Sequence, residues 1–357
     1  MIKPLENNFY DRKELPDVTF LIAAYNEEDF IEAKIKNTLA LNYDPEKFKI
    51  LIITDGSTDN TAQLVSKFSQ IKLMHEDARR GKIAAVHRAM QEVATDLVIF
   101  SDANTILNND AAYNLVRHFK NEKIGAVAGE KRIFSKEQDN ASGAGEGIYW
   151  KYESTLKSWD AQFNTVVGAA GELFAIRTEL YENIPTDTII EDFYLTLRIA
   201  RRGYKVAYEP DASAMEGPSA SVKEEMKRKI RIAAGGLQAI SRLLPLLNIF
   251  RYGWLSFQYV SHRVLRWTLA PLALLLALIS NAVLAMQGNF LYQVLFYLQI
   301  GFYCLSLVGY ILQYKKIKIK IFFIPYYFFI MNLAVYLGFG RFIKKSQPVT
   351  WERAKRG

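Results

Sequence analysis

Five short polar segments lie within residues 24–192, and each carries side chains that could bind a ligand or move a proton. They read Ala24-Tyr25-Asn26-Glu27, Asp55-Gly56-Ser57-Thr58-Asp59, Gly81-Lys82, Ser101-Asp102-Ala103-Asn104 and Glu191-Asp192. Each has an ordinary structural interpretation as a turn or a helix cap. Because five such coincidences would have to occur in succession, the set favours one binding site with acid-base chemistry.

The first two segments suit a nucleoside. Tyr25 offers an aromatic face for a base, and the carboxylates of Glu27 and Asp55 could accept hydrogen bonds from base N–H groups or ribose hydroxyls. The structural alternative for Asp55-Gly56 is a tight turn at the end of a strand, with Asp59 capping the next helix.

Gly81-Lys82, which follows Arg79 and Arg80, suits a phosphate group. The segment opens an expected helix whose free N–H groups and dipole attract anions, and Lys82 adds a point charge. A solvated basic turn is the alternative. His87 on the same helix is expected to be a surface or packed histidine.

Asp102 and Asn104 could share a divalent metal ion. The apolar run at 97–100 places Asp102 at a strand tip, and oxygen-bearing side chains at i and i+2 of an extended segment point the same way. A metal ion held there would neutralise a departing diphosphate. Asparagine supplies an oxygen but one charge fewer than a second acid, which lowers the expected affinity for the metal. The four histidines show no zinc-type spacing.

Glu191 and Asp192 open an expected helix after two isoleucines. Acids are common in a first helical turn because of the helix dipole. The functional interpretation is a general base that takes a proton from an acceptor hydroxyl. A raised pKa at a partly desolvated position would favour that role.

Apolar runs that alternate with amphipathic stretches over the first 210 residues predict an α/β domain with a parallel sheet. Strands are expected at 18–24, 48–54, 71–75 and 97–101, and helices at 28–40, 59–69, 81–93 and 109–119. A second apolar section, 168–176, leads to a helix at 190–202 and two short strands near 205–215. Open α/β sheets bind ligands outside the carboxyl ends of their strands, which is where the polar segments fall.

Three uncharged stretches, 267–287, 290–312 and 321–340, are long enough to span a membrane. A basic helix at 221–240 and a broken apolar segment at 242–260 precede them, and the latter is expected to lie in the membrane interface. With the first 240 residues in the cytoplasm, the lysine-rich loop at 315–320 obeys the positive-inside rule, whereas the basic tail after 340 lands outside against it. Either the third stretch, which contains Pro325, does not cross completely, or the rule is broken here.

The net charge of +8 belongs to the apolar part of the chain. Residues 241–357 contain 14 Lys and Arg against one acid, whereas residues 1–240 contain 31 against 36. Bases that flank apolar spans indicate contact with anionic lipid and argue against nucleic acid as a partner. Cys304 is the only cysteine and the first sixteen residues hold no apolar run, so we expect no internal disulfide and no signal peptide.

The order and wording of these motifs resemble glycosyltransferase family 2, in the membrane-bound branch that includes cellulose, chitin, hyaluronan and poly-N-acetylglucosamine synthases. The resemblance covers about residues 17–340 and is most specific in the first 240. It implies a GT-A fold, which is an α/β, Rossmann-like, nucleotide-sugar-binding domain. It also implies inverting transfer of a sugar from a nucleoside diphosphate, expected to be UDP, with Mg²⁺ or Mn²⁺ as cofactor.

The resemblance assigns roles to individual residues. It implies that the nucleoside is held by Tyr25, Glu27 and Asp55, and that Lys82 lies near the diphosphate. Asp102 with Asn104 would stand for the family's Asp-x-Asp metal motif, and Asp192 would be the catalytic base. The segment 168–172 resembles the family's glycine-rich acceptor segment, where small residues let a sugar approach the backbone. The expected acceptor-binding residues are Gly171, Glu172, Glu191, Arg228 and Arg231.

Two departures from the family pattern bear on the product. Processive synthases carry Gln-x-x-Arg-Trp after the Glu-Asp motif, and the matching positions 228–232 read Arg-Lys-Ile-Arg-Ile here. The missing Trp would stack on the acceptor sugar, so its loss puts long-chain processivity in doubt. Thr54 replaces the first acid of the family's two-acid motif, which leaves that role to Asp55 alone. Arg266-Trp267, at the start of the first span, is expected to be an interfacial anchor pair.

The sequence therefore predicts a cytoplasmic GT-A domain over 1–220, basic and interfacial helices over 221–262, a membrane region over 263–345 and a basic tail over 346–357. The expected function is a metal-dependent, inverting glycosyltransferase that builds a surface or exopolysaccharide at the bacterial inner membrane, with a saccharide acceptor. Transfer to a lipid phosphate or lipid-linked oligosaccharide is a second hypothesis, and product length separates the two. A non-catalytic membrane scaffold is a third, which nucleotide binding without turnover would favour.

Overall fold

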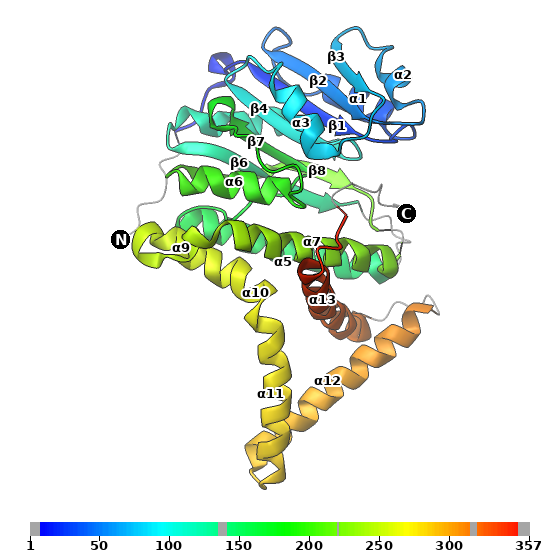
Figure 1. The fold of residues 1–357 in the computed structure, drawn as a ribbon, viewed down its shortest axis with the longest axis vertical. Helices are drawn as coiled ribbons and strands as arrows, with labels where there is room; N and C mark the ends of the chain where they lie inside the picture. The colour runs from blue at the N-terminus through cyan, green and yellow to red at the C-terminus, as the bar shows by residue number, and fades with distance from the viewer. Residues whose placement is uncertain (1–7, 135–140, 220, 315–319, 349–357) are drawn as a thin grey trace.

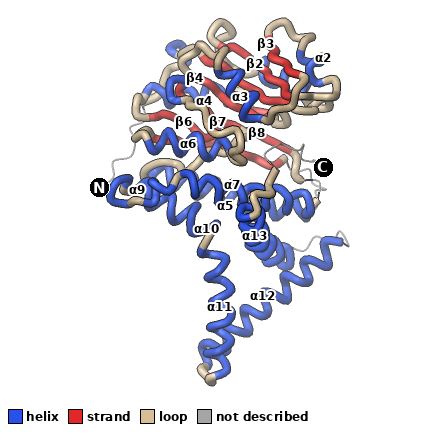
Figure 2. Tube along the Cα trace, in the orientation of Figure 1, coloured by secondary structure: helices blue, strands red, loops and turns tan. Residues whose placement is uncertain are grey.

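The computed structural model describes residues 8–134, 141–219, 221–314 and 320–348. An eight-stranded mixed sheet stands above a layer of helices, and two long helices extend away from that layer (Figure 1). Figure 2 shows that the strands are confined to the upper part and that only helices lie below it. Most of the lysine-rich loop, 315–319, and the basic tail from 349 onward lie outside the described residues.

The first half of the sheet is parallel, as predicted. β1 (Val18–Ala24) lies between β2 (Phe48–Asp55) and β4 (Leu97–Asp102), and β3 (Ile71–Glu76) pairs with β2 at the edge. Every residue of β1 is buried, and its uninterrupted apolar sequence reflects burial on both faces of the sheet. The four predicted strands agree with the observed ones to within one residue.

Short helices connect these strands, because parallel neighbours need a crossover connection. They are α1 (Ile31–Leu39), α2 (Thr61–Val65), α3 (Lys82–Met90) and α4 (Ala111–Val116), the last followed by a 3-10 turn, η2 (Arg117–Lys120). A further 3-10 turn, η1 (Arg12–Glu14), precedes the sheet. Each α-helix begins later than predicted, since the first residues of each predicted range form polar turns.

The second half of the sheet mixes directions. β7 (Leu173–Arg177) runs antiparallel to β4 and to β6 (Ile124–Ile133), and β8 (Lys205–Glu216) lies parallel to β6 and antiparallel to the short β5 (Ile106–Leu107). The strand order is β3-β2-β1-β4-β7-β6-β8-β5. The two short strands predicted near 205–215 are one long strand. Its register shifts opposite Gly129 and Glu130, where residues 210–212 leave the ladder and separate two apolar runs.

Below the sheet lies a helical layer that joins the two parts of the molecule (Figure 1). It contains α5 (Ala141–Phe163), which the sequence analysis did not predict, and α7 (Val222–Arg242), which it did; α6 (Glu191–Arg201) lies next to the sheet, after the 3-10 turn η3 (Thr178–Leu180). The chain then forms η4 (Leu244–Leu247), α8 (Ile249–Tyr252) and α9 (Trp254–Tyr259). A π-helical turn, η5 (Val260–Val264), and α10 (Leu265–Trp267) complete the layer.

The segment 244–257 presents apolar side chains to the outside. Exposed residues include Leu244, Ile249, Phe250, Trp254 and Phe257, and Phe250 is 98% exposed. Such a segment of short helices suits the interface of a membrane. Its location in the interface, like the predicted domain boundaries, stays a prediction.

In the described part of the chain, three helices are long and apolar enough to cross a membrane. They are α11 (Leu269–Met286), α12 (Phe290–Tyr314) and α13 (Lys320–Ile343), at the positions predicted from the sequence. Only 6% of the first candidate span and 11% of the second are buried, whereas 39% of the third is buried. α13 packs on α7 so closely that a Cβ on Gly338 would lie 2.6 Å from the Cβ of Ala233.

Candidate active site

The loops that follow β1 and β2 are joined by hydrogen bonds. Asn26 Oδ1 accepts a hydrogen bond from the backbone N–H of Thr58 at 2.8 Å, and the N–H of Glu27 donates to Thr61 Oγ1 at 2.8 Å. Asn26 adopts a left-handed backbone conformation (φ 53°), which asparagine tolerates better than most residues. The structure thus brings Tyr25 and Glu27 next to the turn after β2, and their role in nucleoside binding stays a prediction.

Asp55 is 3% exposed, and its carboxylate holds the basic loop that precedes α3. Oδ1 accepts a hydrogen bond from the N–H of Arg80 at 3.0 Å, and Oδ2 accepts one from the N–H of Gly81 at 2.6 Å. Gly56 has φ +67°, and an added Cβ would lie 2.6 Å from Arg79 Cβ, so only glycine allows the two loops to approach this closely. Asp55 therefore fixes the start of α3 at the carboxyl end of β2.

The ring of Tyr25 lies against the side chain of Arg79, whose Cζ is 3.8 Å from the ring centroid. This flat pair stands at the same edge of the sheet as Asp55. On α3, His87 Nε2 accepts a hydrogen bond from the N–H of Ile184 at 3.3 Å, and burial lowers the pKa of His87. His87 is a packed histidine, as predicted.

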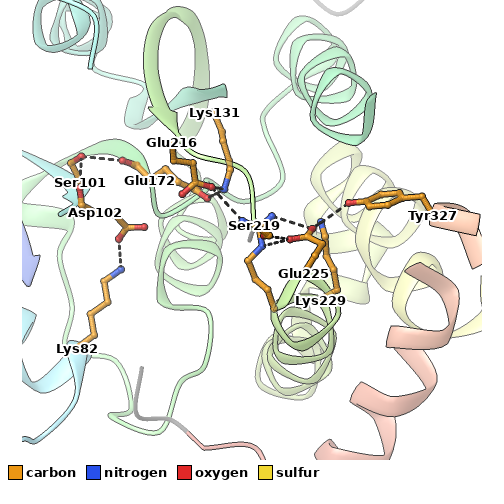
Figure 3. Close-up of polar contacts among 11 residues, drawn as sticks. Lys82, Ser101, Asp102, Lys131, Glu172, Glu216, Ser219, Glu225, Lys229 and Tyr327 are labelled. Atoms are coloured by element: carbon orange, nitrogen blue, oxygen red, sulfur yellow. Dashed lines mark hydrogen bonds and ion pairs between the residues drawn. The ribbon is translucent and has the colours of Figure 1, made fainter. Parts of the chain in front are cut away.

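Lys82, the first residue of α3, bridges two acids from distant parts of the chain. Its Nζ lies 2.9 Å from Asp102 Oδ1 at the end of β4, a contact drawn in Figure 3. It also lies 2.7 Å from Glu191 Oε1, on the first residue of α6. Burial by itself would lower the pKa of Lys82, but the two carboxylates outweigh it, so the pKa is raised and the side chain stays charged.

Asp192 lies beside this cluster and has the electrostatics of a general base. Burial raises its pKa to about 7, with a further contribution from the charge of Glu191 and against the influence of Lys82. A carboxylate with a pKa near neutrality can take up a proton at physiological pH. Gly171 faces it, since an added Cβ would lie 3.4 Å from Asp192 Oδ2, and the absence of a side chain leaves room next to the carboxylate.

The glycine-rich segment before β7 is held against α6. Gly168 has φ +87°, and a Cβ there would collide with the ring of Phe193. The N–H of Ala169 donates to Thr196 Oγ1 at 3.0 Å. These contacts explain why small residues are required in this segment and how Gly171 is kept opposite Asp192.

Asp102 ends β4, as predicted, but Asn104 lies in the turn that follows. The prediction that Asp102 and Asn104 lie on one extended segment, from which the metal site was inferred, is therefore wrong. Within the described ranges, no three His, Cys, Asp or Glu side chains are grouped closely enough to hold a metal ion. The oxygen donors of Asp102 and Asn104 still fit a hard cation that takes few protein ligands and completes its shell with substrate phosphates, which is how Mg²⁺ is usually bound.

A buried ionic network begins at Glu172. Lys131 of β6, whose side chain is 1% exposed, forms ion pairs with Glu172 and with Glu216 of β8 (Figure 3). Burial opposes the ionisation of Glu172, but Lys131 holds the pKa of that carboxyl well below its usual range. Arg228 of α7 continues the network to Glu216 at 3.3 Å and to Glu225 at 3.1 Å. Two predicted acceptor-binding residues, Glu172 and Arg228, therefore have charged partners within the protein.

The network extends to the third candidate membrane helix. Glu225 Oε1 accepts a hydrogen bond from Tyr327 Oη of α13 at 3.2 Å and lies 3.5 Å from Lys229 Nζ. Sequence analysis missed Lys131, Glu216 and Glu225, because their partners are spread over two strands and two helices and form no local motif.

Arg231 lies next to the Glu-Asp motif, since its Nη2 donates to the carbonyl oxygen of Ile189 at 3.4 Å. Glu191, expected on the acceptor side, is the partner of Lys82. A small and mostly apolar pocket adjoins the cluster, with Lys82, Asp102, Glu191 and Gly171 among its lining residues. The structure therefore brings all five polar motifs and the glycine-rich segment to one edge of the sheet.

The interpretation of Arg266-Trp267 as an interfacial anchor pair is wrong. Trp267 is 8% exposed, and its ring packs on Gly236 and lies 5.4 Å from the ring of Phe193. Arg266 points inward because Glu153 of α5 supplies a buried partner for its charge. Both residues therefore hold α10 against the layer that carries Asp192.

Comparison with known proteins agrees with this geometry. Residues 19–184 match the model of the family "Glycosyl transferase family 2". A poly-beta-1,6-N-acetyl-D-glucosamine synthase from Staphylococcus aureus (strain MSSA476) is 33% identical over 240 residues, which are 64% of this chain and 57% of that protein. A synthase of the same name from Staphylococcus epidermidis is 30% identical over 245 residues, 65% of this chain and 57% of the relative. The aligned part thus spans 57% of the length of both relatives.

A solved structure shares the fold. It is the mannosyltransferase PcManGT from Pyrobaculum calidifontis in complex with GDP-Man and Mn²⁺, with a TM-score of 0.72 and 23% identity over 96% of this chain and 91% of that one. The likeness confirms the predicted GT-A fold together with the helical region that follows it. Residues 19–184 thus match the glycosyl transferase family 2 model, and the chain has a GT-A fold joined to three helices that are, among the described residues, long enough to cross a membrane.

Proposed function

We propose that the protein is a membrane-bound, inverting glycosyltransferase that moves a sugar from a nucleoside-diphosphate sugar to a saccharide acceptor, in the synthesis of a surface or extracellular polysaccharide. One observation carries the proposal: Asp192, with a pKa near 7, lies beside the cluster of Lys82, Asp102 and Glu191 at the carboxyl end of β4. The named activity of the staphylococcal relatives supports the polysaccharide product.

The donor is assigned to the loops after β1 and β2. The flat pair of Tyr25 and Arg79 would take the base, and Glu27 and Asp55, in the neighbouring loops, would hold the ribose. Lys82 would neutralise charge on the diphosphate, since its own charge is retained in this site. We propose UDP as the nucleotide, and the GDP-Man of the structural neighbour is the obvious competitor to test.

Mg²⁺ or Mn²⁺ is the proposed cofactor, held by Asp102 with Asn104. When bound, the ion would stabilise the charge that develops on the departing diphosphate. Mn²⁺ in the neighbouring mannosyltransferase supports this assignment. Lys82 brings a second positive charge to the same carboxylate, 2.9 Å from Asp102 Oδ1.

Asp192 is the proposed base. As the acceptor oxygen attacks the anomeric carbon, its proton moves to the Asp192 carboxylate and the bond from that carbon to the diphosphate oxygen breaks. A single displacement of this kind inverts the configuration at the carbon. Gly171 leaves the space beside the carboxylate that the acceptor needs.

Transfer to a lipid phosphate or a lipid-linked oligosaccharide is a second candidate function. One observation favours it, namely that Ile232 stands where processive synthases have the Trp that stacks on the acceptor sugar. The basic residues around the apolar helices also suit contact with anionic lipid, and we propose a bacterial inner membrane with the catalytic domain on the cytoplasmic side.

The test is sugar transfer by the protein in lipid, with labelled nucleotide sugars, Mg²⁺ or Mn²⁺, and Asp192→Asn as the variant. We expect transfer to fall about 10²- to 10⁴-fold while nucleotide binding is retained. Asp44→Asn, at an exposed turn, is the matched control. Equal loss of transfer and binding in Asp192→Asn would contradict the base assignment. A long polymer supports synthesis of polysaccharide, and a single-sugar lipid product supports the second candidate.

A further inference from the structure

Lys34 is a completely buried lysine in α1. Lysine is almost never fully buried, because taking an amine out of water costs several kcal/mol and a methionine would fill the same space. Its Nζ lies 2.7 Å from Ser101 Oγ and 2.9 Å from Thr105 Oγ1. The two hydroxyls flank Asp102 and Asn104 in the sequence, so the buried amine contacts both ends of the turn that carries these two residues.

Thr105 connects Lys34 to the donor side of the site. Thr105 is also fully buried, and its hydroxyl donates to the carbonyl oxygen of Asp102 at 2.9 Å. This hydrogen bond closes the turn that carries Asp102 and Asn104. Asn37, one helical turn after Lys34, holds the far end, because its side chain exchanges two hydrogen bonds with the backbone of Leu107 at 2.8 and 2.9 Å.

Ser101 connects Lys34 to the acceptor side. Its hydroxyl donates to the carbonyl oxygen of Glu172 at 3.0 Å, a contact drawn in Figure 3. Glu172 directly follows Gly171, which faces the Asp192 carboxylate. One side chain thus reaches, through two hydroxyls, both the metal-motif turn and the segment opposite the base.

Lys34 also determines which way these hydrogen bonds run. Nζ donates to both hydroxyls, so each hydroxyl accepts from it and keeps its own hydrogen for a carbonyl oxygen. Ser101 Oγ and Thr105 Oγ1 are themselves only 3.2 Å apart. Without Nζ, they can bond to each other, and one of the two carbonyl oxygens then loses its donor.

We propose that Lys34 is a positioning residue that holds the Asp102–Asn104 turn and the Gly171–Glu172 segment at a fixed distance from each other. The two halves of the site then present donor and acceptor in the geometry that transfer needs. The predicted effect of Lys34 on turnover rests on the proposed function. The predicted effect on nucleotide binding can be measured whether or not the protein transfers sugar.

Lys34→Met tests the proposal, since the two side chains are similar in length and only the amine is removed. Lys36→Met is the matched control, because Lys36 lies on the same helix with a side chain that is 67% exposed. The measurements are calorimetric binding of UDP and GDP with Mn²⁺, turnover with the labelled donors, and thermal unfolding. We expect Lys34→Met to weaken nucleotide binding and to lower turnover, each by about 10- to 100-fold, as removal of outer partners of a metal site usually does. Its melting temperature should not fall below that of the control, because an unfavourable buried amine is removed.

Two further variants test the Thr105 contact and the Ser101 contact separately. They also replace Lys34→Met if that variant does not fold. Thr105→Val should weaken nucleotide binding and also lower turnover, because it loosens the turn that carries Asp102 and Asn104. Ser101→Ala should lower turnover and leave nucleotide binding intact. Identical effects of these two variants on both measurements would overturn the proposal. So would a Lys34→Met protein that binds and turns over like Lys36→Met, or one whose losses only match its fraction of unfolded protein. A wild-type protein that binds nucleotide but transfers no sugar would contradict the proposed function, and the binding measurements would still test the Thr105 arm.

Discussion

The pKa of Asp192 makes the pH dependence of sugar transfer a sharp test of the site. If Asp192 is the base and its pKa is about 7, only the deprotonated carboxylate is active. The deprotonated fraction is then about one tenth at pH 6 and about nine tenths at pH 8, so kcat/KM should rise about tenfold between them. With the ordinary pKa of 3.8, the carboxylate would be ionised throughout this range and kcat/KM would not change.

Glu191→Gln perturbs this pKa without touching Asp192. Burial, the largest cause of the raised pKa, remains, but the charge of Glu191 is removed and Lys82 loses one of its two carboxylate partners. Both changes favour the ionised form of Asp192. We expect the acid limb of kcat/KM to move down by about one pH unit, so that at pH 6 the variant keeps about half of its own maximal kcat/KM, against about one tenth for the wild type.

The assay is kcat/KM from about pH 5.5 to 9 at constant ionic strength, because kcat/KM reports the pKa of the ligand-free enzyme. Nucleotide binding is measured at each pH to separate binding from chemistry. Glu179→Gln, at an exposed position on the loop after β7, is the matched control and should keep the wild-type profile. A wild-type kcat/KM that is flat between pH 6 and 8 would refute the raised pKa. An acid limb that stays in place in an active Glu191→Gln protein would refute Glu191 as one of its causes.

Two further predictions concern packing and charge. Gly56→Ala should weaken nucleotide binding and lower the free energy of unfolding by about 1–3 kcal/mol, because φ +67° is strained for alanine and its Cβ would displace the Arg79 backbone. Gly203→Ala is the control, since Gly203 has φ +97° but open space around it. It should lower the melting temperature and leave nucleotide binding, measured by calorimetry, unchanged. Glu153→Gln should destabilise the protein at pH 7 by up to about 3–5 kcal/mol, because Arg263 and the partly exposed Arg266 lose their buried carboxylate partner. Burial opposes ionisation of Glu153, but the two arginines hold its pKa far below the usual range, so the stabilisation is present above the unfolded-state pKa, about 4.3, and is lost as the pH falls below it. Equal melting temperatures of the wild type and Glu153→Gln at pH 7 would contradict this account.

The parallel half of the fold was predictable because each strand and helix there is marked by a local pattern of apolar and polar residues. β1 and β4 are short apolar runs, each followed directly by a polar turn and an amphipathic stretch. The second half was harder, since β6 carries the charged residues Glu130 and Lys131 within a strand. Lys131 is buried only because Glu172 and Glu216 neutralise it, and both partners come from later in the chain. No pattern within β6 reveals this.

For the site, the sequence predicted which residues gather but not how they pair. Lys82 and Asp102 were expected near the same diphosphate, whereas the contact of Lys82 with Glu191 depends on where α6 begins relative to α3. The prediction that Trp267 is an interfacial anchor was wrong because hydropathy carries no information on tertiary contacts. The indole ring is buried on a flat surface at Gly236, which lies on another helix. Lys34 gave no signal at all, because a lysine on an amphipathic helix is normally solvated.

The π-helical turn at Val260–Val264 lies between α9 and α10, on the path from the helical layer to α11. A π-turn holds one more residue than an α-turn within one full turn of the chain, so the additional residue is taken up inside the turn and the helices on either side keep their angular phase. Loss of a single codon here would convert the turn to an α-turn and leave the packed faces of α9 and α10 unchanged. The connection between the helical layer and the apolar helices can thus change by one residue without rotation of the helices that it joins.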